Sequence, residues 1–301
     1  MLSILIQNQD ENRKLLGDLD GIDILLQQLA YYKKHDPSTA DEAEYMENLF
    51  NTLCSALMLP SNRVKFLKGE GLQLMRLILR EQKNARTSAL KVLSYAMNNL
   101  DGKESCQAFV EMLGLGVLFP LFMKPIKISK KKNKNTYNNE EHIVSIIASL
   151  LKNCTGNSKQ RVVLKFTEND YDKVDRLLEL YFKYAAEVKA EDLNIEKDRA
   201  QASDDEDEDE QEVEYYMRRL ENGLFALQSI CYIIMDIFIN GPSGISKRIS
   251  KLLNLRKEPK TNIISVVKVY KENLGETEQN KSSSSFKEEM ERIAELIERF
   301  Q

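Results

Sequence analysis

The sequence has few of the residues on which catalytic and metal-binding sites depend. Its 301 residues include no Trp, two His and four Cys. Neither His35 nor His142 is surrounded in the sequence by a catalytic constellation of Asp, Cys or Ser. No glycine-rich segment has the spacing of a phosphate-binding loop. We therefore predict no enzyme activity, no catalytic residue, no metal site and no cofactor.

The four cysteines are too far apart in the sequence to form a metal-ligand or redox motif. They are Cys54, Cys106, Cys154 and Cys231, and each lies within an apolar stretch of helical character. Free cysteine behaves as a small apolar side chain and is usually buried. The sequence predicts four reduced thiols in the core.

A secretory signal and a long uninterrupted apolar run are also missing. Residues 1–6 contain no basic residue and lead directly into a polar segment, which does not fit a signal peptide. The longest apolar stretch, residues 223–239, contains Gln228, Ser229 and Asp236. It is shorter than the roughly 20 apolar residues of a membrane span. We expect an intracellular protein without a membrane partner, in which this stretch is a buried helix.

Only six Pro and twelve Gly interrupt a chain that is otherwise rich in helix-forming residues. At 42% hydrophobic and 30% charged residues, its composition is close to ordinary globular usage and supports a packed core. The composition therefore predicts an all-α protein.

Two similar segments and a looser third one form a repeat. Asn12 and Gly21 in the first segment recur as Asn62 and Gly71, fifty residues later. The looser copy begins at Cys106 and was aligned by its Gly116. Each copy predicts a short apolar helix, a glycine break and a second apolar helix. Longer predicted helices over residues 45–59, 85–99 and 140–153 alternate with the copies.

Three helices in roughly 45 residues are typical of armadillo repeats, whose units bury their apolar faces only by stacking. We predict an armadillo-type α-solenoid with a C-terminal helical cap. Residues 1–167 would form the repeats, the first of them incomplete, and residues 168–301 the capping region. A fold of this kind holds other proteins.

Helix ends are predicted from the usual cap residues. Thr39 to Glu42 has the pattern of a capping box, while Gly17, Gly69 and Gly102 are interpreted as helix stops. After a start signal at residues 167–170, the repeat period is lost. The helices predicted beyond it cover residues 171–199, 213–240, 246–253 and 262–273.

A last predicted helix has an apolar stripe that needs a surface to cover it. Its members, spaced by three or four residues, are Phe286, Met290, Ile293, Ile297 and Phe300. Two uses remain open at this stage. The stripe either packs within the chain, as a terminal cap does, or contacts a partner or a second copy in a homodimer.

The net charge is only −4, but charge is concentrated in two runs of opposite sign. Residues 203–214 contain nine carboxylates, and residues 201–212 are predicted to form an acidic loop. Such a block is either a solvated loop or a flexible tether for basic partners. Ser203, which precedes three acidic residues, is a candidate phosphorylation site.

The basic run contains a short pattern typical of nuclear localisation signals. Its candidate residues are Lys130, Lys131, Lys132 and Lys134. The alternative is a solvated insertion between two helices. Only Tyr137 lies near these lysines, so the run lacks the aromatic residues of a base-stacking platform. We expect no direct, sequence-specific binding of nucleic acid.

Longer strings in the sequence resemble the beta-catenin-like family of nuclear armadillo-repeat splicing factors. The resemblance is carried by residues 9–29, 66–75, 165–170 and 230–233, among others. It covers nearly the whole chain but only the C-terminal half of the family. Residues 1–6 are interpreted as the last turns of a third helix whose repeat is missing. The resemblance thus implies a short isoform, a fragment or an incomplete gene model.

The resemblance implies a non-enzymatic subunit of the NineTeen complex of the spliceosome. Such a subunit acts in the nucleus and binds basic localisation segments of splicing proteins. A cytoplasmic armadillo adaptor in adhesion or trafficking is the alternative, because fold alone does not decide function. The absence of Trp argues against the Trp and Asn arrays of nuclear-import adaptors. Partner contacts are predicted on the third helices, at Asn51, Ser55, Ser94, Asn98, Ser149 and Asn153.

Overall fold

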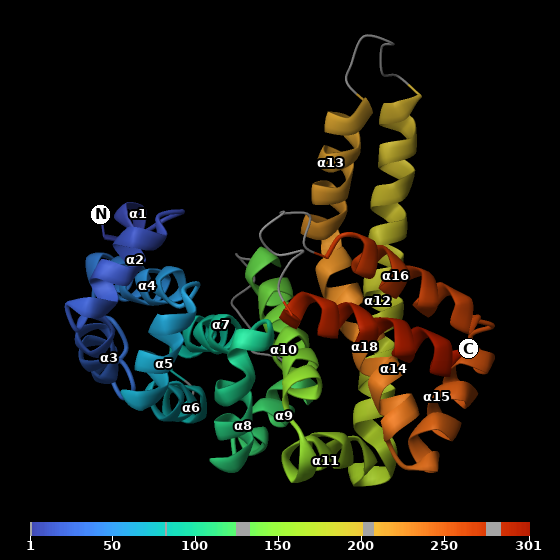
Figure 1. The fold of residues 1–301 in the computed structure, drawn as a ribbon, viewed down its shortest axis with the longest axis horizontal. Helices are drawn as coiled ribbons and strands as arrows, with labels where there is room; N and C mark the ends of the chain where they lie inside the picture. Colours follow the sequence, from blue (N-terminus) through green and yellow to red (C-terminus); the bar gives the residue numbers. More distant parts are fainter. Residues whose placement is uncertain (1, 82, 125–132, 201–207, 275–283) are drawn as a thin grey trace. The chain divides into compact units, whose positions relative to one another are not determined.

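The computed structural model describes residues 2–81, 83–124, 133–200, 208–274 and 284–301 (Figure 1). The chain divides into two compact units, Met1–Val162 and Val163–Gln301. Across the described residues, all regular secondary structure is helical and there is no strand. The all-α prediction is confirmed.

Unit 1 contains three repeats of three helices, which confirms the armadillo-type arrangement. A short helix, α1 (Leu2–Leu5), precedes them. The repeats are α2 (Asp10–Asp18), α3 (Gly21–Tyr31) and α4 (Ala40–Ala56); α5 (Pro60–Lys68), α6 (Gly71–Glu81) and α7 (Arg86–Met97); and α8 (Lys103–Glu111), α9 (Leu115–Met123) and α10 (Asn133–Asn153). A further helix, α11 (Gly156–Leu164), ends the unit.

Helices in the same position of successive repeats pack against each other. First helices α2 and α5 are in contact, second helices α3, α6 and α9 form a row, and third helices α4, α7 and α10 form another. Phe50, Phe66 and Phe109 are fully buried between these rows. The core is therefore continuous from repeat to repeat, as stacking of incomplete units requires.

The helix ends follow the sequence signals only in part. Thr39 caps α4, since its hydroxyl accepts a hydrogen bond from the Glu42 amide at 3.1 Å, and Gly69 is the C-cap residue of α5. The prediction that Gly17 stops a helix was wrong, because Gly17 lies inside α2. The prediction for Gly102 was also wrong, because Gly102 comes directly before α8 and is its N-cap residue.

In the third repeat, the glycine that corresponds to Gly21 and Gly71 is Gly114 and not Gly116. In the first two repeats, a Cβ on Gly21 or Gly71 would collide with the apolar side chain five residues earlier, at 2.4 and 2.3 Å. A Cβ on Gly114 would meet Phe109 at 2.5 Å in the same way, whereas Gly116 has nothing within 4 Å. The feature that the three repeats share is a glycine whose backbone lies in close contact with a buried side chain. Gly116 makes no such contact.

The third helices differ from the predicted ranges at both ends. α4 ends at Ala56 and not at residue 59, and α7 ends at Met97. α10 begins at Asn133, seven residues before the predicted start. Asn98 therefore follows α7 in extended conformation and is not on a third helix.

Unit 2 is built around a buried central helix, α14 (Phe225–Asn240). The surrounding helices are α12 (Glu168–Arg199), α15 (Ser243–Leu255), α16 (Lys260–Glu272) and α18 (Ser284–Phe300), all of which contact α14. Ile293 and Phe300 of α18 are fully buried, and the Phe300 ring lies 4.9 Å from that of Phe238. The apolar stripe thus packs within its own unit, on α14 and α16.

The predicted helix at residues 213–240 is two helices. α13 (Glu208–Arg219) is followed by a π-helical turn, Leu220–Leu224, in which Asn222 and Gly223 have non-helical backbone angles. A positive φ of 101° at Gly223 favours glycine at the bend. The acidic segment 208–212 therefore belongs to a helix, not to a loop.

By length and composition, the longer helical segment Glu210–Asn240, which contains the apolar run 223–239, could cross a membrane. However, 67% of its most apolar window is buried inside the protein, which confirms the buried helix. The pair Lys103–Glu111 and Leu115–Met123 passes the same test only as one broken span, and it is bent by 92°.

The four cysteines are free and buried, as predicted. Burial raises the pKa of Cys54 to about 12 and that of Cys154 to about 11. Both thiols are therefore protonated at neutral pH and lack the thiolate that a nucleophile needs.

Candidate protein-interaction surface

Each third helix of unit 1 has a polar stripe with the three- and four-residue spacing of one helix face. The stripes are Glu44, Glu47, Asn51 and Ser55 on α4; Ser88, Lys91 and Ser94 on α7; and Glu141, His142, Ser145 and Ser149 on α10. Because α4, α7 and α10 pack side by side, the three stripes adjoin one another. Ser88, Ser145 and Ser149 are buried, and we call the remaining stripe residues, which are exposed or half-buried, the third-helix surface.

Hydrogen bonds connect neighbouring stripes across the repeats. The Ser88 hydroxyl donates to the Glu47 carboxylate at 2.9 Å, and the Lys91 ammonium donates to the Asn51 Oδ1 at 3.0 Å. These bonds join α7 to α4. On the other side of α7, the Ser94 and Ser145 hydroxyls lie 3.5 Å apart. The polar groups therefore hold adjacent repeats in register as well as facing solvent.

Negative charge predominates on the third-helix surface. Glu44 and Glu47 form no ion pair with any residue that the structure describes. Burial, followed by the charge of Lys91, lowers the pKa of His142 to about 4, so this imidazole is neutral at pH 7. Burial also raises the pKa of Glu141 above its usual value. Lys91 is thus the single cation among the stripe residues named above, and the surface suits a basic ligand.

The six predicted partner-binding residues differ in exposure and in position. Asn51, Ser55 and Ser94 are half-buried on the third-helix surface. Ser149 and Asn153 are only 6% and 4% exposed. These two are not accessible to a partner in this conformation, and Asn98 lies outside the third helices.

Asn153 has a structural role at the end of α7. Its side-chain amide donates to the Asn99 carbonyl at 2.7 Å and to the Met97 carbonyl at 3.3 Å. Both carbonyls are at the C-terminal end of a helix, where intrahelical partners are missing. Asn153 therefore caps the preceding third helix from the last turn of the next one.

Sequence reasoning missed the residues that give the surface its charge. Glu47 is exposed, Lys91 and His142 are half-buried, and they lie four, three and seven residues from the predicted positions Asn51, Ser94 and Ser149. The same helical spacing that suggested Asn51 and Ser94 would have found them. Their contacts, in contrast, depend on how neighbouring repeats stack, which one sequence does not specify.

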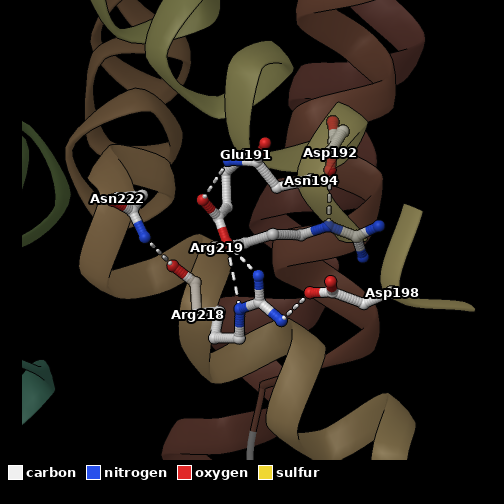
Figure 2. A network of polar contacts seen from close by, with 7 residues as sticks. All are labelled: Glu191, Asp192, Asn194, Asp198, Arg218, Arg219 and Asn222. Carbon is white, nitrogen blue, oxygen red and sulfur yellow. Dashed lines mark hydrogen bonds and ion pairs between the residues drawn. The ribbon is translucent and has the colours of Figure 1, made fainter. Parts of the chain in front are cut away.

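A second concentration of charge is in unit 2, where α12 and α13 run side by side (Figure 1). Arg218 bridges two carboxylates of α12, Glu191 at 2.8 Å and Asp198 at 2.7 Å, and Arg219 pairs with Asp192 at 2.7 Å (Figure 2). Hydrogen bonds that Arg218 donates to Asp198 and Glu191 raise the pKa of Arg218. The basic end of α13 is thus neutralised by α12.

The acidic end of α13 has one further connection to α12, an ion pair between Glu212 and Arg199. The Arg199 guanidinium also lies 5.2 Å from the centre of the Tyr215 ring. These contacts explain why residues 208–212 are helical despite their charge. The candidate phosphorylation site, Ser203, lies outside the described residues.

The basic run also lies mostly outside the described residues. Lys130, Lys131 and Lys132 are not described, and Lys134 falls in the first turn of α10. Whether they form a nuclear-localisation signal stays a prediction.

Among the residues that the structure describes, no group of three or more His, Cys, Asp or Glu side chains is placed to hold a metal ion. The arrangement described above offers hydrogen-bonding groups and charge rather than a reactive centre.

Comparison with known proteins gives consistent results. The model of the family described as "Catenin-beta-like, Arm-motif containing nuclear" matches residues 1–268. The chain is 50% identical to human "Beta-catenin-like protein 1" and 50% identical to the bovine protein of that name, over its full length. It is 31% identical to "Beta-catenin-like protein 1 homolog" of Schizosaccharomyces pombe over 92% of its length. The alignments cover 53% of the two mammalian proteins and 47% of the yeast one, so the chain spans about half their length.

Proposed function

Because this chain belongs to the Catenin-beta-like, Arm-motif containing nuclear family, we propose that it is a non-enzymatic protein-interaction scaffold of the nucleus. It acts in pre-mRNA splicing, within the spliceosome-associated NineTeen complex, by binding basic segments of partner proteins. It contacts neither a membrane nor a specific nucleic-acid sequence. The resemblance of the sequence to nuclear armadillo-repeat splicing factors supports this role.

The observation that carries the proposal is the negative third-helix surface. Glu44 and Glu47 offer carboxylates without an ion-pair partner among the described residues, and Asn51 and Ser94 offer hydrogen-bonding groups beside them. An extended basic segment presents ammonium and guanidinium groups together with free backbone amides and carbonyls. Charge attracts the segment, and the polar side chains fix its position.

Lys91 allows a test of whether the ligand of this surface is positively charged. It is the cation in the middle of the surface, so a basic ligand is repelled by it and attracted by the carboxylates. With a labelled Lys/Arg-rich peptide, we expect Glu44→Gln together with Glu47→Gln to weaken binding by about threefold or more, near 0.7 kcal/mol. Lys91→Gln should strengthen binding to a similar degree, as measured by fluorescence anisotropy at low and high salt.

Glu104→Gln is the matched control, because Glu104 is an exposed carboxylate on α8, the first helix of the third repeat, and lies outside the third-helix surface. If Glu104→Gln weakens binding as much as the α4 changes do, only overall charge matters and the third-helix surface is not the site. If Lys91→Gln weakens binding, the ligand is not basic.

The cellular role requires a separate measurement. Affinity purification from nuclear extract with the wild-type chain should recover splicing proteins, and the Glu44→Gln, Glu47→Gln variant should recover fewer of them. Recovery of adhesion or trafficking proteins in their place, from cytoplasmic extract, would favour the cytoplasmic adaptor and contradict the nuclear role.

A further inference from the structure

The exposed side of α13 is apolar along one edge and acidic along the other. Val213 is 62% exposed and Met217 is 51% exposed, and the two are one helical turn apart. Tyr215 faces the opposite way and is 6% exposed. The packing of α13 in unit 2 therefore uses the Tyr215 side and leaves Val213 and Met217 uncovered.

Acidic residues lie on the same exposed side. Glu210, Glu214 and Glu221 are spaced by four and seven residues and are all exposed. At the 100° of rotation that each α-helical residue contributes, Glu210, Glu214 and Met217 occupy one quarter of the circumference of α13, and Glu221 lies in the π-helical turn that follows. None of the three carboxylates forms an ion pair with a described residue.

The cations of α13 do not balance these carboxylates. Arg218 and Arg219 point toward α12 and are engaged by its carboxylates (Figure 2). Arg199 is engaged by Glu212 and stacks near Tyr215. The unpaired charge on the exposed side of α13 is therefore only negative. It lies next to the exposed apolar side chains of Val213 and Met217.

We propose that the exposed side of α13 is a docking surface for an amphipathic helix with basic flanks. The apolar face of such a helix would cover Val213 and Met217, and its Lys or Arg residues would meet Glu210, Glu214 and Glu221. Charge complementarity selects this occupant, because a neutral or acidic helix would leave three carboxylates opposed by no cation. Helix-on-helix docking through residues one turn apart is an established mode of peptide recognition.

This surface is distinct from the one in the proposed function. It is in unit 2, it uses apolar contacts, and its ligand is helical, whereas the third-helix surface is in unit 1 and binds an extended basic segment. Either proposal can therefore fail without the other.

The test uses the full 301-residue chain and designed peptides of about 18 residues, long enough to form a helix on binding. One peptide places Leu along one face and Lys along its edges, a second has the same composition in scrambled order, and a third has Glu in place of Lys. We expect the first to bind and the other two to bind at least about tenfold more weakly, which is 1.4 kcal/mol. Failure of every designed amphipathic basic peptide to bind would overturn the proposal.

Substitutions then locate the site. Val213→Gln together with Met217→Gln should weaken binding about tenfold, and Glu210→Gln, Glu214→Gln and Glu221→Gln together should weaken it and reduce its salt dependence. Gln is a good helix former, so α13 should persist. The matched control is Leu255→Gln, since Leu255 is 70% exposed on α15. Equal affinities of the control and the Val213→Gln, Met217→Gln variant would contradict the proposal.

Methyl NMR of labelled methionine provides a readout that does not depend on affinity alone. The Met217 resonance, assigned with Met217→Leu, should shift on addition of the amphipathic peptide, while those of the buried Met75 and Met97 should not. An unchanged Met217 resonance at saturating peptide would overturn the assignment. So would sedimentation data in which the wild-type chain is a dimer and the Val213→Gln, Met217→Gln variant is a monomer, because a second copy would then be the occupant.

Discussion

The first two repeats of unit 1 have the same Asn-Arg pair on their first helices, but only the second pair donates hydrogen bonds that join neighbouring repeats. Asn62 is completely buried and donates to the Arg13 carbonyl at 2.9 Å and to the Ala56 carbonyl at 3.0 Å. Its counterpart Asn12 is exposed and donates only to the Leu5 carbonyl, at 2.7 Å. The same residue type thus joins two repeats in one place and closes a local turn in the other.

The arginines differ in the same way. Arg63 donates from Nε to the Leu57 carbonyl at 2.7 Å and from a terminal nitrogen to the Asn98 carbonyl at 2.6 Å. It therefore connects the C-terminal ends of two successive third helices. Arg13 is equally buried, but its Nε has no hydrogen-bond partner, and it pairs with Asp10 at 2.6 Å. A junction between repeats depends on carbonyls that only a neighbouring third helix supplies.

The third repeat solves the same problem with different residues. Ser105 and Cys106 occupy the positions of the pair, forty-three residues after it by the spacing of Gly71 and Gly114. At the end of α7, the Met97 carbonyl accepts hydrogen bonds from the Cys106 thiol and from the Asn153 amide, and Asn153 also donates to the Asn99 carbonyl. What the repeats share is the need to satisfy the end of each third helix, not one residue that does so.

The largest effect should come from Arg63. Arg63→Met keeps the apolar part of the side chain but leaves the Leu57 and Asn98 carbonyls without a donor, and we expect a loss of about 3 kcal/mol in the free energy of unfolding of unit 1. Arg13→Met should change it by less than about 1 kcal/mol, because no carbonyl loses a partner and an unsatisfied Nε is removed.

Chemical denaturation combined with hydrogen exchange of α5 and α7 would measure this difference. Exchange is needed because two units do not unfold as one two-state system. Equal losses for Arg63→Met and Arg13→Met would show that the two arginines contribute through burial and packing alone.

Asn153→Ala should have the next largest effect, about 2 kcal/mol, because the buried Asn153 amide loses its hydrogen bonds to the Met97 and Asn99 carbonyls at the end of α7. The change distinguishes a residue that joins successive repeats from one that binds a partner. Affinity for a basic peptide should stay within about twofold of wild type at a temperature where the variant is folded. A variant of wild-type stability with lost affinity would place Asn153 in the binding site, as the sequence analysis predicted.

Much of unit 1 could be predicted from the sequence, because the repeat spacing of Asn12 and Asn62 is local information about helix and turn positions. The junctions could not. Gly17 has the pattern of a helix stop, but it is a glycine because the Asn62 side chain, forty-five residues later, lies against it. Gly116 looked like a repeat marker, while the marker is the contact of Gly114 with Phe109.

The candidate sites show the same limit. Helical spacing identified the half-buried Asn51, Ser55 and Ser94, since that spacing follows from one helix alone. The burial of Asn153 depends on the end of another repeat. The helicity of residues 208–212 depends on ion pairs with α12 that the sequence does not place. Features that rest on contacts between distant segments were the ones missed.

Gly17→Ala should have a smaller effect: it should lower the free energy of unfolding by about 1 kcal/mol in the wild-type chain. In a chain that also has Asn62→Ala, the same change should raise it. A Cβ at position 17 would lie 2.0 Å from the Asn62 Oδ1, so the junction must shift. Ala is, however, the better helix former by about 1 kcal/mol. In an Asn62→Ala background the collision is gone, and Gly17→Ala should then be stabilising. A double-mutant cycle by denaturation measures the coupling, and the same sign in both backgrounds would rule out the contact as its cause.

The smallest effect should be that of Leu15→Lys, which places on the first repeat the residue that the second repeat has at position 65. Leu15 and Leu19 are 57% and 66% exposed, part of an open apolar face on α2. A side chain that is mostly in water loses little when it becomes polar, so the free energy of unfolding should change by less than about 0.5 kcal/mol. Thermal melts at two protein concentrations provide the measurement, with Lys65→Leu as the reciprocal change. A loss well above 1 kcal/mol that grows with concentration would mean that another molecule covers this face in solution.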